Sequence, residues 1–315
     1  MRIIVVAKCP GPCSDPLLFF APPVEYAADA PASVERFLPL CVHAVVRRSK
    51  LRLDGFTRRF AVAGAPETIA VDHLTLDVHQ GEFLVIVGPS GCGKTTVLNV
   101  LAGLDMPTSG TVAIDDRIIT GPGPDRGVMF QDYALFPWQT VRGNVEFGLL
   151  HGPAGAGLDR AAREERVRRT IDLVGLAGSE RKYPHQLSGG MRQRAALARL
   201  IANEPDVLLM DEPLAALDAQ TRIILQDELL RIWGQDKPPA ARRTVVFITH
   251  AIDEAVFLAD RVAVMTAHPG RLKVVVDIPL PRPRSDATRA QPEFQGLTQQ
   301  IWSLIRDEAY RATVV

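Results

Sequence analysis

The turn at residues 88–95, with the sequence GPSGCGKT, constrains this chain more than any other feature. It matches the pattern G-x-x-x-x-G-K-[ST], and it lies between the apolar run 83–87 and a stretch of helical character at 94–103. Small residues let such a backbone curl, so its N–H groups and the helix N-terminus point at phosphate oxygens while Lys94 adds a positive charge. A glycine-rich turn without a ligand is the alternative, but the strand, the spacing, the lysine and the helix together favour a phosphate site.

This turn supplies most of the residues that we expect to contact a nucleotide. The Thr95 hydroxyl is expected to bind Mg²⁺, and Lys94 is expected to act in catalysis as well as in binding. The contacts predicted from the turn and the helix that follows are Gly88, Pro89, Ser90, Gly91, Cys92, Gly93, Lys94, Thr95 and Thr96.

Four continuous apolar runs predict strands that are buried on both faces of a sheet. They lie at 83–87, 207–210, 244–248 and 261–265. Helical stretches alternate with them, at 94–103, 161–176, 191–203 and 253–260. This alternation predicts an α/β fold with a mostly parallel sheet, the core of a P-loop NTPase.

The remaining segments suggest how the chain is divided. Alternating apolar and polar residues at 51–56 and 68–78 predict an N-terminal antiparallel β subdomain. The segment from about 131 to 195 has no strong strand pattern, so it is expected to be a helical insertion. Residues 1–49 lack a sustained period and are expected to be a poorly ordered extension, whereas 281–315 are expected to form a tail with one helix.

Two adjacent acids follow the apolar run 207–210. A phosphate turn binds a nucleotide but does not hydrolyse it, so a carboxylate for the metal ion and another for the water are needed. Asp211 and Glu212 stand side by side at the strand end, where successive side chains point in opposite directions. We assign Asp211 to the Mg²⁺ shell, through water, and Glu212 to the attacking water. Alone, such a pair could be a solvated strand end, but the phosphate turn gives it meaning.

A second glycine-rich turn opens the helical stretch at 191–203. Its sequence is Leu187-Ser-Gly-Gly-Met191, and it offers another helix N-terminus suited to an anion. It has no P-loop lysine, and as an isolated pattern it could be an ordinary helix start capped by Ser188. Its meaning therefore depends on the motifs around it.

The order of these motifs resembles the ATP-binding subunits of ABC transporters. GPSGCGKT is followed by Gln131 in VMFQDYALFPW, by LSGGMRQR, by VLLMDEP, by Leu217-Asp218 and by His250 in FITHAIDEA. The resemblance covers residues from about 51 to 280 and implies an ABC ATP-binding domain at 50–280, with ATP and Mg²⁺ as its ligands.

The resemblance also assigns residues on both sides of the nucleotide. It implies that Phe60 stacks on adenine, that Gln131 contacts Mg²⁺ and the attacking water, and that His250 contacts the γ-phosphate. A histidine that ends a strand is otherwise more often ordinary than catalytic, and only its position among the other motifs reverses this.

Other positions are implied to act across a subunit interface. Ser188, Gly189 and Gly190 would hold the γ-phosphate of an ATP bound by a second copy of the chain, and Asp218 would line the interface. The family often has S-A-L-D at this loop, whereas Ala215 stands in place of the serine here. One hydrogen bond of the implied interface is therefore in question.

The same resemblance implies a role in transport. Two segments, GPGPDRGVMFQDYALFPWQTVRGNVEFGL and ADRVAVMTAHPGRL, resemble sequences of the nitrate, sulfonate, taurine and bicarbonate group of bacterial importers. The expected partners are a separate transmembrane permease and, indirectly, a periplasmic solute-binding protein. Phe136, Pro137 and Trp138 form an apolar stretch that could dock the permease or could pack on the helical insertion.

Two functions other than transport are alternatives for this sequence. A non-transport ABC ATPase acting on a soluble or nucleic-acid complex usually has two cassettes or a long coiled coil, whereas only about 90 residues separate Lys94 from Ser188. A nucleotide-binding regulatory subunit without turnover is disfavoured by Glu212.

The charge composition argues against a nucleic-acid-binding function. Lys+Arg and Asp+Glu are both 36, so the net charge offers no general attraction to nucleic acid. The arginine-rich stretch 161–176 also contains interleaved glutamates and an apolar face formed by Val167, Ile171 and Val174, which indicates a solvated helix on a packed stripe.

The cysteines and the apolar runs suggest a location. Four cysteines do not form a disulfide framework, and the pair Cys9 and Cys13 lacks partners for a metal site, so a reducing cytoplasm fits. No apolar run reaches the roughly 18–20 residues of a membrane span, and the N-terminus does not read as a signal peptide. We expect a peripheral protein on the cytoplasmic face of the inner (plasma) membrane.

Overall fold

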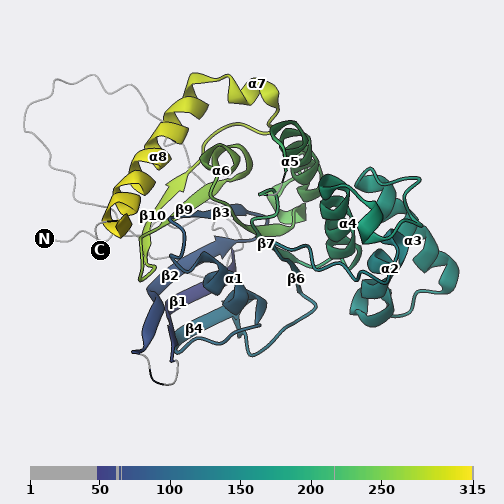
Figure 1. Cartoon of the computed structure of the whole chain (residues 1–315), viewed down its shortest axis with the longest axis horizontal. Helices are drawn as coiled ribbons and strands as arrows, with labels where there is room; N and C mark the ends of the chain where they lie inside the picture. The colour runs from purple at the N-terminus through teal and green to yellow at the C-terminus, as the bar shows by residue number, and fades with distance from the viewer. Residues whose placement is uncertain (1–47, 62–63, 65, 216, 314–315) are drawn as a thin grey trace, which may run out of the picture. The chain divides into compact units, whose positions relative to one another are not determined.

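The computed structural model describes residues 48–313 apart from 62–63, 65 and 216. The extension predicted at 1–49 falls almost entirely outside the described residues. Two sheets and a set of helices make up the described part, as Figure 1 shows. The predicted α/β fold, with a mostly parallel sheet, an antiparallel β part and added helices, is confirmed.

A six-stranded sheet lies at the centre, in the strand order β10-β9-β3-β8-β7-β6. Its strands are β3 (Phe83–Val87), β6 (Arg126–Met129), β7 (Val207–Asp211), β8 (Thr244–Ile248), β9 (Arg261–Met265) and β10 (Leu272–Asp277). All neighbours are parallel except β10, which runs antiparallel to β9. Phe83, Val85 and Val87 enter one hydrophobic core, whereas Leu84 and Ile86 enter the other, because successive residues of a strand face opposite sides.

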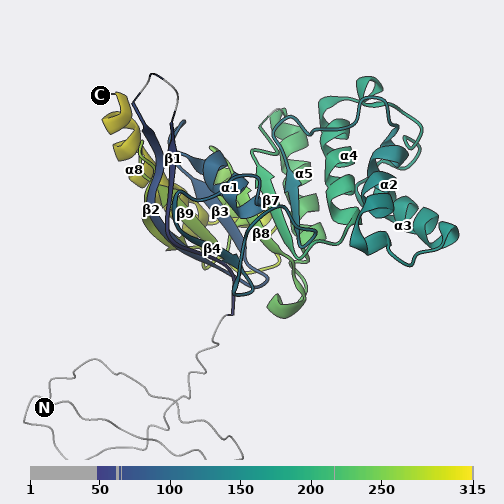
Figure 2. The ribbon, with the colours of Figure 1, turned by 90° about the horizontal axis from the view of Figure 1, so that it is seen from below.

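A four-stranded antiparallel sheet covers one face of the central sheet. Its order is β2-β1-β4-β5, with β1 (Ser49–Phe60), β2 (Thr68–His79), β4 (Ser109–Ile114) and β5 (Arg117–Ile118). Helix α1 (Lys94–Ala102) lies between the two sheets and shares their apolar core (Figure 2). The buried ammonium of Lys50 fixes the start of β1, since it lies 2.7 Å from Asp115 and 3.0 Å from Asp206.

Helices cover the opposite face of the central sheet. They are α5 (Ala219–Trp233), α6 (Ile252–Leu258), α7 (Asp286–Arg289) and α8 (Pro292–Thr313). Trp233 packs edge-on against Phe83 with ring centroids 5.6 Å apart, so α5 contacts the first residue of β3 directly. Within the described residues, no helix has both the length and the apolar character that a membrane span requires.

Three further helices gather beyond the β6–β7 edge, as both views of the ribbon show. They are α2 (Val141–His151), α3 (Arg160–Leu173) and α4 (Gly189–Ala202). Short 3₁₀ turns are η1 (Pro153–Gly155), η2 (Pro184–Gln186) and η3 (Pro239–Ala241). The predicted stripe of Val167, Ile171 and Val174 is buried, and Glu165 pairs with two neighbouring arginines on the solvent side.

The helix predicted at 161–176 ends earlier than expected. Its last residue is Leu173, and Gly175 follows with a φ of 67°. Only glycine adopts this left-handed conformation without strain, so the chain turns there rather than continuing the helix.

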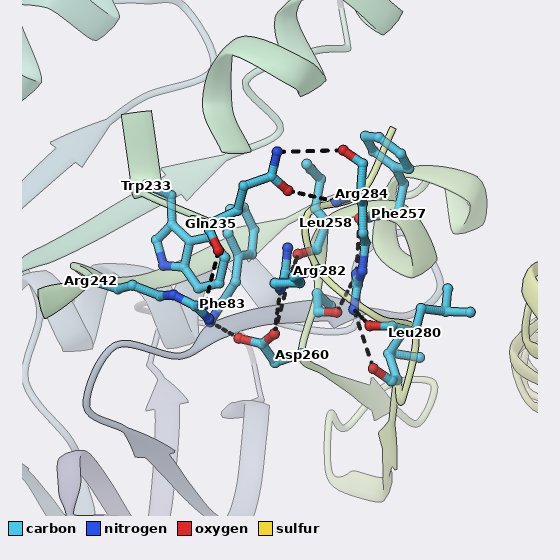
Figure 3. Close-up of polar contacts among 12 residues, drawn as sticks. Phe83, Trp233, Gln235, Arg242, Phe257, Leu258, Asp260, Leu280, Arg282 and Arg284 are labelled. Atoms are coloured by element: carbon cyan, nitrogen blue, oxygen red, sulfur yellow. Dashed lines mark hydrogen bonds and ion pairs between the residues drawn. The ribbon is translucent and has the colours of Figure 1, made fainter. Parts of the chain in front are cut away.

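Arginines join the segment after β10 to α6. Arg284 is 3% exposed, and its guanidinium donates to the carbonyls of Val256, Phe257, Ala259, Ile278 and Leu280 (Figure 3). Burial lowers the pKa of Arg284 to about 9, so the side chain still carries its charge at neutral pH. A cation at a helix C-terminus is favourable, and this one satisfies the last carbonyls of α6.

A second arginine strengthens the same junction. Arg282 pairs with Asp260 at 2.8 Å and donates to the carbonyl of Leu258. The guanidiniums of Arg282 and Arg242 both stack on the Trp233 ring, at 4.3 Å and 4.6 Å from its centroid. The segment 281–284, with the sequence PRPR, is therefore an anchor for α5 and α6.

Candidate active site

Four segments with predicted chemistry follow four neighbouring parallel strands. The turn 88–95 follows β3, His250 follows β8, Asp211 and Glu212 end β7, and Gln131 lies just after β6. Because β3, β8, β7 and β6 are adjacent and parallel, their carboxyl ends form one edge of the sheet. Ligands of open α/β sheets bind at such an edge.

Glycines make room for the turn 88–95. A Cβ at Gly88 would lie 2.9 Å from the Cys92 sulfur, and one at Gly93 would lie 2.7 Å from the carbonyl oxygen of Ala70. Gly91 and Gly93 also have left-handed φ angles of 74° and 90°. The turn is thus closed to larger side chains and can present its backbone to an anion.

Lys94 begins α1 and reaches back over the turn. Its buried ammonium donates to the carbonyls of Gly88 and Pro89, both at 2.9 Å. The adjacent Cys92 is fully buried, and burial raises the pKa of its thiol. The only cation of the turn therefore lies where the backbone curls, which is where phosphate oxygens would lie.

Asp211 ends β7 beside the turn. Burial raises the pKa of its carboxyl group, whereas a hydrogen bond from the Thr95 hydroxyl and the charge of Lys94 act in the opposite direction. A hydroxyl and a carboxylate in contact form an oxygen donor set of the kind that Mg²⁺ prefers. These residues therefore fit a magnesium ion bound together with a nucleotide.

Glu212 and His250 face each other at the ends of β7 and β8. His250 Nδ1 lies 3.4 Å from Glu212 Oε2, and the backbone N–H of Glu212 donates to the carbonyl of Ile248 at 3.0 Å. Glu212 has a φ of 44°, a left-handed conformation that costs a glutamate roughly 1–3 kcal/mol. The charge of Glu212 is near enough to Asp211 to add to the raised pKa of the Asp211 carboxyl group.

The segment after Gln131 is held from α4. Gln131 is exposed, and Tyr133 and Ala134 have positive φ angles. Arg199 donates to the carbonyls of both, at 2.8 Å and 2.5 Å, and lies 5.5 Å from the centroid of the Phe136 ring. The sequence did not single out Arg199, although an arginine within the alanine- and leucine-rich 195–202 segment was a signal.

The apolar stretch 136–138 has one packed aromatic residue and one exposed aromatic residue. Phe136 packs against Phe147 of α2 with ring centroids 4.5 Å apart, whereas Trp138 is 70% exposed. Phe136 therefore belongs to the packing of the helical part, and Trp138 belongs to the surface. The packing alternative therefore holds for Phe136, whereas the docking alternative stays a prediction that concerns Trp138.

The two remaining loops cap helices and stand apart from the turn 88–95. The Ser188 side chain accepts from the Met191 N–H at the start of α4, and Asp218 accepts from Thr221 at the start of α5. Among the described residues, no hydrogen bond or ion pair joins Ser188, Gly189, Gly190 or Asp218 to the turn. Backbone hydrogen bonds from the first turn of α5 hold the pKa of Asp218 below its usual value.

Phe60 ends β1 with its ring partly exposed. The Arg58 guanidinium lies 4.6 Å from the ring centroid. Another residue near the site, Glu254, was missed from the sequence; it lies in α6, four positions after His250, and is buried. A lone acid on the apolar side of a short helix was the available signal.

Comparisons with known proteins agree with this geometry. The family model described as ABC transporter matches residues 71–215. An uncharacterised ABC transporter ATP-binding protein of Methanocaldococcus jannaschii is 49% identical over 263 residues, covering 84% of this chain and 94% of the relative. An aliphatic sulfonates import ATP-binding protein of Bacillus licheniformis is 44% identical, covering 76% and 88%. A nitrate import ATP-binding protein of Synechocystis is 42% identical, covering 79% and 92%.

A solved structure gives the same result. It is a dimeric ATP-binding cassette in a post-hydrolysis state with ADP and phosphate bound, with a TM-score of 0.64 and 31% sequence identity. The match covers 72% of this chain and 98% of the chain in that structure. One edge of the sheet carries the phosphate turn, the acidic pair and the histidine, and a relative that is 49% identical matches most of the chain. The chain therefore belongs to the ATP-binding proteins of the ABC transporter family, which hydrolyse ATP.

Proposed function

We propose that this ATPase powers the import of a small anion through a separate membrane permease. The observation that carries the ATPase part is the edge formed by β3, β8 and β7, where Lys94, Glu212 and His250 converge. The sulfonate and nitrate import names of two relatives support an anion such as nitrate, a sulfonate, taurine or bicarbonate as the cargo. A periplasmic solute-binding protein would deliver it, and the chain would act at the cytoplasmic face of the inner membrane.

The residues of the edge divide the work of hydrolysis. The turn 88–95 would hold the β- and γ-phosphates through its N–H groups and Lys94. Thr95, Asp211 and Gln131 would hold Mg²⁺, which supplies positive charge to the phosphates when bound. Glu212 would accept a proton from the attacking water, and His250, within 3.4 Å of Glu212, would contact the γ-phosphate.

The LSGG turn would act on a second nucleotide. Ser188 caps α4 and Gly189 and Gly190 open it, and among the described residues no hydrogen bond or ion pair links them to the turn 88–95 of their own chain. A head-to-tail dimer would bring the two elements together, with Asp218 at the interface. The dimeric cassette among the solved structures supports this arrangement.

A groove next to the helical part is the proposed docking site for the permease. It has a volume of about 400 Å³ and is lined by residues of β6, α2, α4 and the loops that flank them, among them Phe136, Phe147, His151, Arg199 and Asn203. The exposed Trp138 lies in the same loop as Phe136, and their ring centroids are 5.6 Å apart. An apolar groove of this kind suits a short helix from a partner.

Phe60→Ala is expected to weaken ATP binding by about tenfold, because one aromatic–base stack contributes about 1–3 kcal/mol. Phe60→Trp should bind ATP as the wild type does, since it keeps a ring for the base. Titration of the purified protein with a fluorescent ATP analogue measures both. An unchanged dissociation constant for Phe60→Ala would remove adenine stacking from this residue.

Trp138→Ala is expected to lower ATP-driven anion uptake by at least fivefold in vesicles that contain the proposed permease partner. An exposed tryptophan at an interface typically contributes 2 kcal/mol or more, so assembly with the permease should weaken by about thirtyfold. The matched control is Leu150→Ala, which changes an exposed apolar residue of α2. Failure of the wild-type protein to drive uptake of nitrate, a sulfonate, taurine or bicarbonate would refute the importer proposal.

A further inference from the structure

Glu254 is a buried carboxylate that the scheme above does not use. It lies in the first turn of α6 and is 3% exposed. Burying a carboxylate is costly unless it is paired, and an apolar side chain of similar size would pack α6 at least as well. Its presence therefore calls for an account of what it binds.

One oxygen of Glu254 holds the backbone on both sides of His250. The Thr249 hydroxyl donates to Glu254 Oε2 at 2.7 Å, and the same hydroxyl accepts from the Ala251 N–H at 3.0 Å. His250 lies between these two residues. Its loop is thus tied to α6 through a single hydroxyl.

The other oxygen faces the loop that carries Asp218. Arg222 Nε lies 3.3 Å from Glu254 Oε1 in an ion pair that lacks hydrogen-bond geometry. Arg222 Nη2 also donates to the carbonyl of Leu217 at 3.0 Å, next to Asp218. Arg222 therefore joins Glu254 to the turn before α5.

Helix α6 is fixed at its other end. Arg284 donates to three carbonyls at the end of α6 (Figure 3), and the Arg289 guanidinium lies 3.5 Å from the centroid of the Phe257 ring. Arg289 also donates to Gln226 at 2.6 Å, and the side chain of Gln226 hydrogen-bonds Glu254. Glu254 is therefore mounted on a helix that has little freedom to shift.

From these contacts we infer that Glu254 is a positioning residue, which couples the loop of His250 to the loop of Asp218 through Thr249 and Arg222. The inference rests on the proposed dimer, in which His250 contacts the γ-phosphate and Asp218 lines the interface. Because α6 is fixed, Glu254 holds both loops in one arrangement, and a loop that moves must break a contact that also holds the other. Nucleotide contact and dimer contact then change together.

Burial raises the pKa of Glu254, while the hydrogen bond from the Thr249 hydroxyl and the charge of Arg222 act in the opposite direction. The partners thus favour the charged form that burial disfavours. Removing the charge alone should break the link to Arg222 and keep an acceptor for Thr249.

The test compares Glu254→Gln, Arg222→Gln and the double variant, with kcat normalised to the fraction of protein that binds ADP. Glu254→Gln is expected to lower kcat by about 10- to 100-fold, because small misplacements of catalytic groups are costly, with KM for ATP changed less than threefold. Arg222→Gln should lower kcat as well, and the double variant should be no slower than Glu254→Gln alone, as expected for one pathway. Both should weaken ATP-induced dimerisation when introduced into Glu212→Gln.

A matched control is available at the opposite edge of the sheet. Glu82, just before β3, is buried and pairs with Arg261 at 3.1 Å, so Glu82→Gln makes the same chemical change in a similar pair. It is expected to keep kcat within twofold of the wild type. Arg222 is one-third exposed, so its variant tests the link even if Glu254→Gln folds poorly.

The inference is overturned if Glu254→Gln and Arg222→Gln keep kcat within twofold, if their effects multiply in the double variant, or if Glu82→Gln is equally slow. Failure of the proposed function looks different. In that case the wild-type protein would not turn over ATP, or Glu212→Gln would retain its activity and stay monomeric.

Discussion

Glu212→Gln is expected to lower the rate of ATP hydrolysis by about 10²- to 10⁴-fold, the usual contribution of a general base. Glutamine keeps the size and the hydrogen-bonding acceptor of glutamate but cannot take a proton from water. The dissociation constant for ATP should stay within a few-fold, since the turn 88–95 is untouched. Because the proposed dimer would close on ATP and could not reopen through hydrolysis, ATP and Mg²⁺ should hold the variant as a dimer in size-exclusion chromatography.

A second glutamate provides the control for this substitution. Glu204 also has a positive φ, 48°, but it is exposed and pairs with Arg166. Glu204→Gln therefore repeats the chemical change in the same backbone conformation away from the site, and it should hydrolyse ATP at the wild-type rate. A Glu212→Gln protein with wild-type hydrolysis, or one that stays monomeric with ATP, would refute the role assigned to Glu212.

Arg284→Met is expected to lower the free energy of unfolding by about 3–5 kcal/mol. Methionine fills much of the volume but leaves five carbonyls without the guanidinium that they share, and buried acceptors without a partner are costly. The end of α6 also loses a favourable cation. Urea unfolding followed by tryptophan fluorescence measures the change, since Trp233 packs in this region.

The control for Arg284 is an exposed arginine of α8. Arg306→Met should change the free energy of unfolding by less than about 0.5 kcal/mol, as surface substitutions usually do. A loss below about 1 kcal/mol for Arg284→Met would mean that the five hydrogen bonds contribute little beyond their desolvation cost.

The strands that the sequence predicted best are those buried on both faces. The runs 83–87, 244–248 and 261–265 match β3, β8 and β9 to the residue, because each consists of apolar residues, after a polar first residue in β8 and β9, and is bounded by polar or glycine residues. Strand β6 was not predicted. It has four residues and begins with Arg126, which is buried because its guanidinium donates to the Gly121 carbonyl and pairs with Asp125.

The residues of the candidate site also fall into those that the sequence predicted and those that it did not. The phosphate turn and the acidic pair could be found from the sequence, because their residue types and spacing are dictated by chemistry close along the chain. Glu254 and Arg284 could not, because their partners come from other elements. Arg284 lies in the segment 281–315 that was predicted only as a C-terminal tail, whereas the carbonyls that it binds lie up to 28 residues away.

The order of strands has a consequence for how the chain is made. Strand β3 ends at Val87, yet its two neighbours in the sheet, β8 and β9, begin only at Thr244 and Arg261. At roughly 5–20 residues per second, a ribosome needs on the order of ten seconds or more to supply them. During that interval β3, with its apolar side chains and unpaired backbone groups, lacks both sheet partners, so newborn chains should depend on chaperones until the last third has emerged.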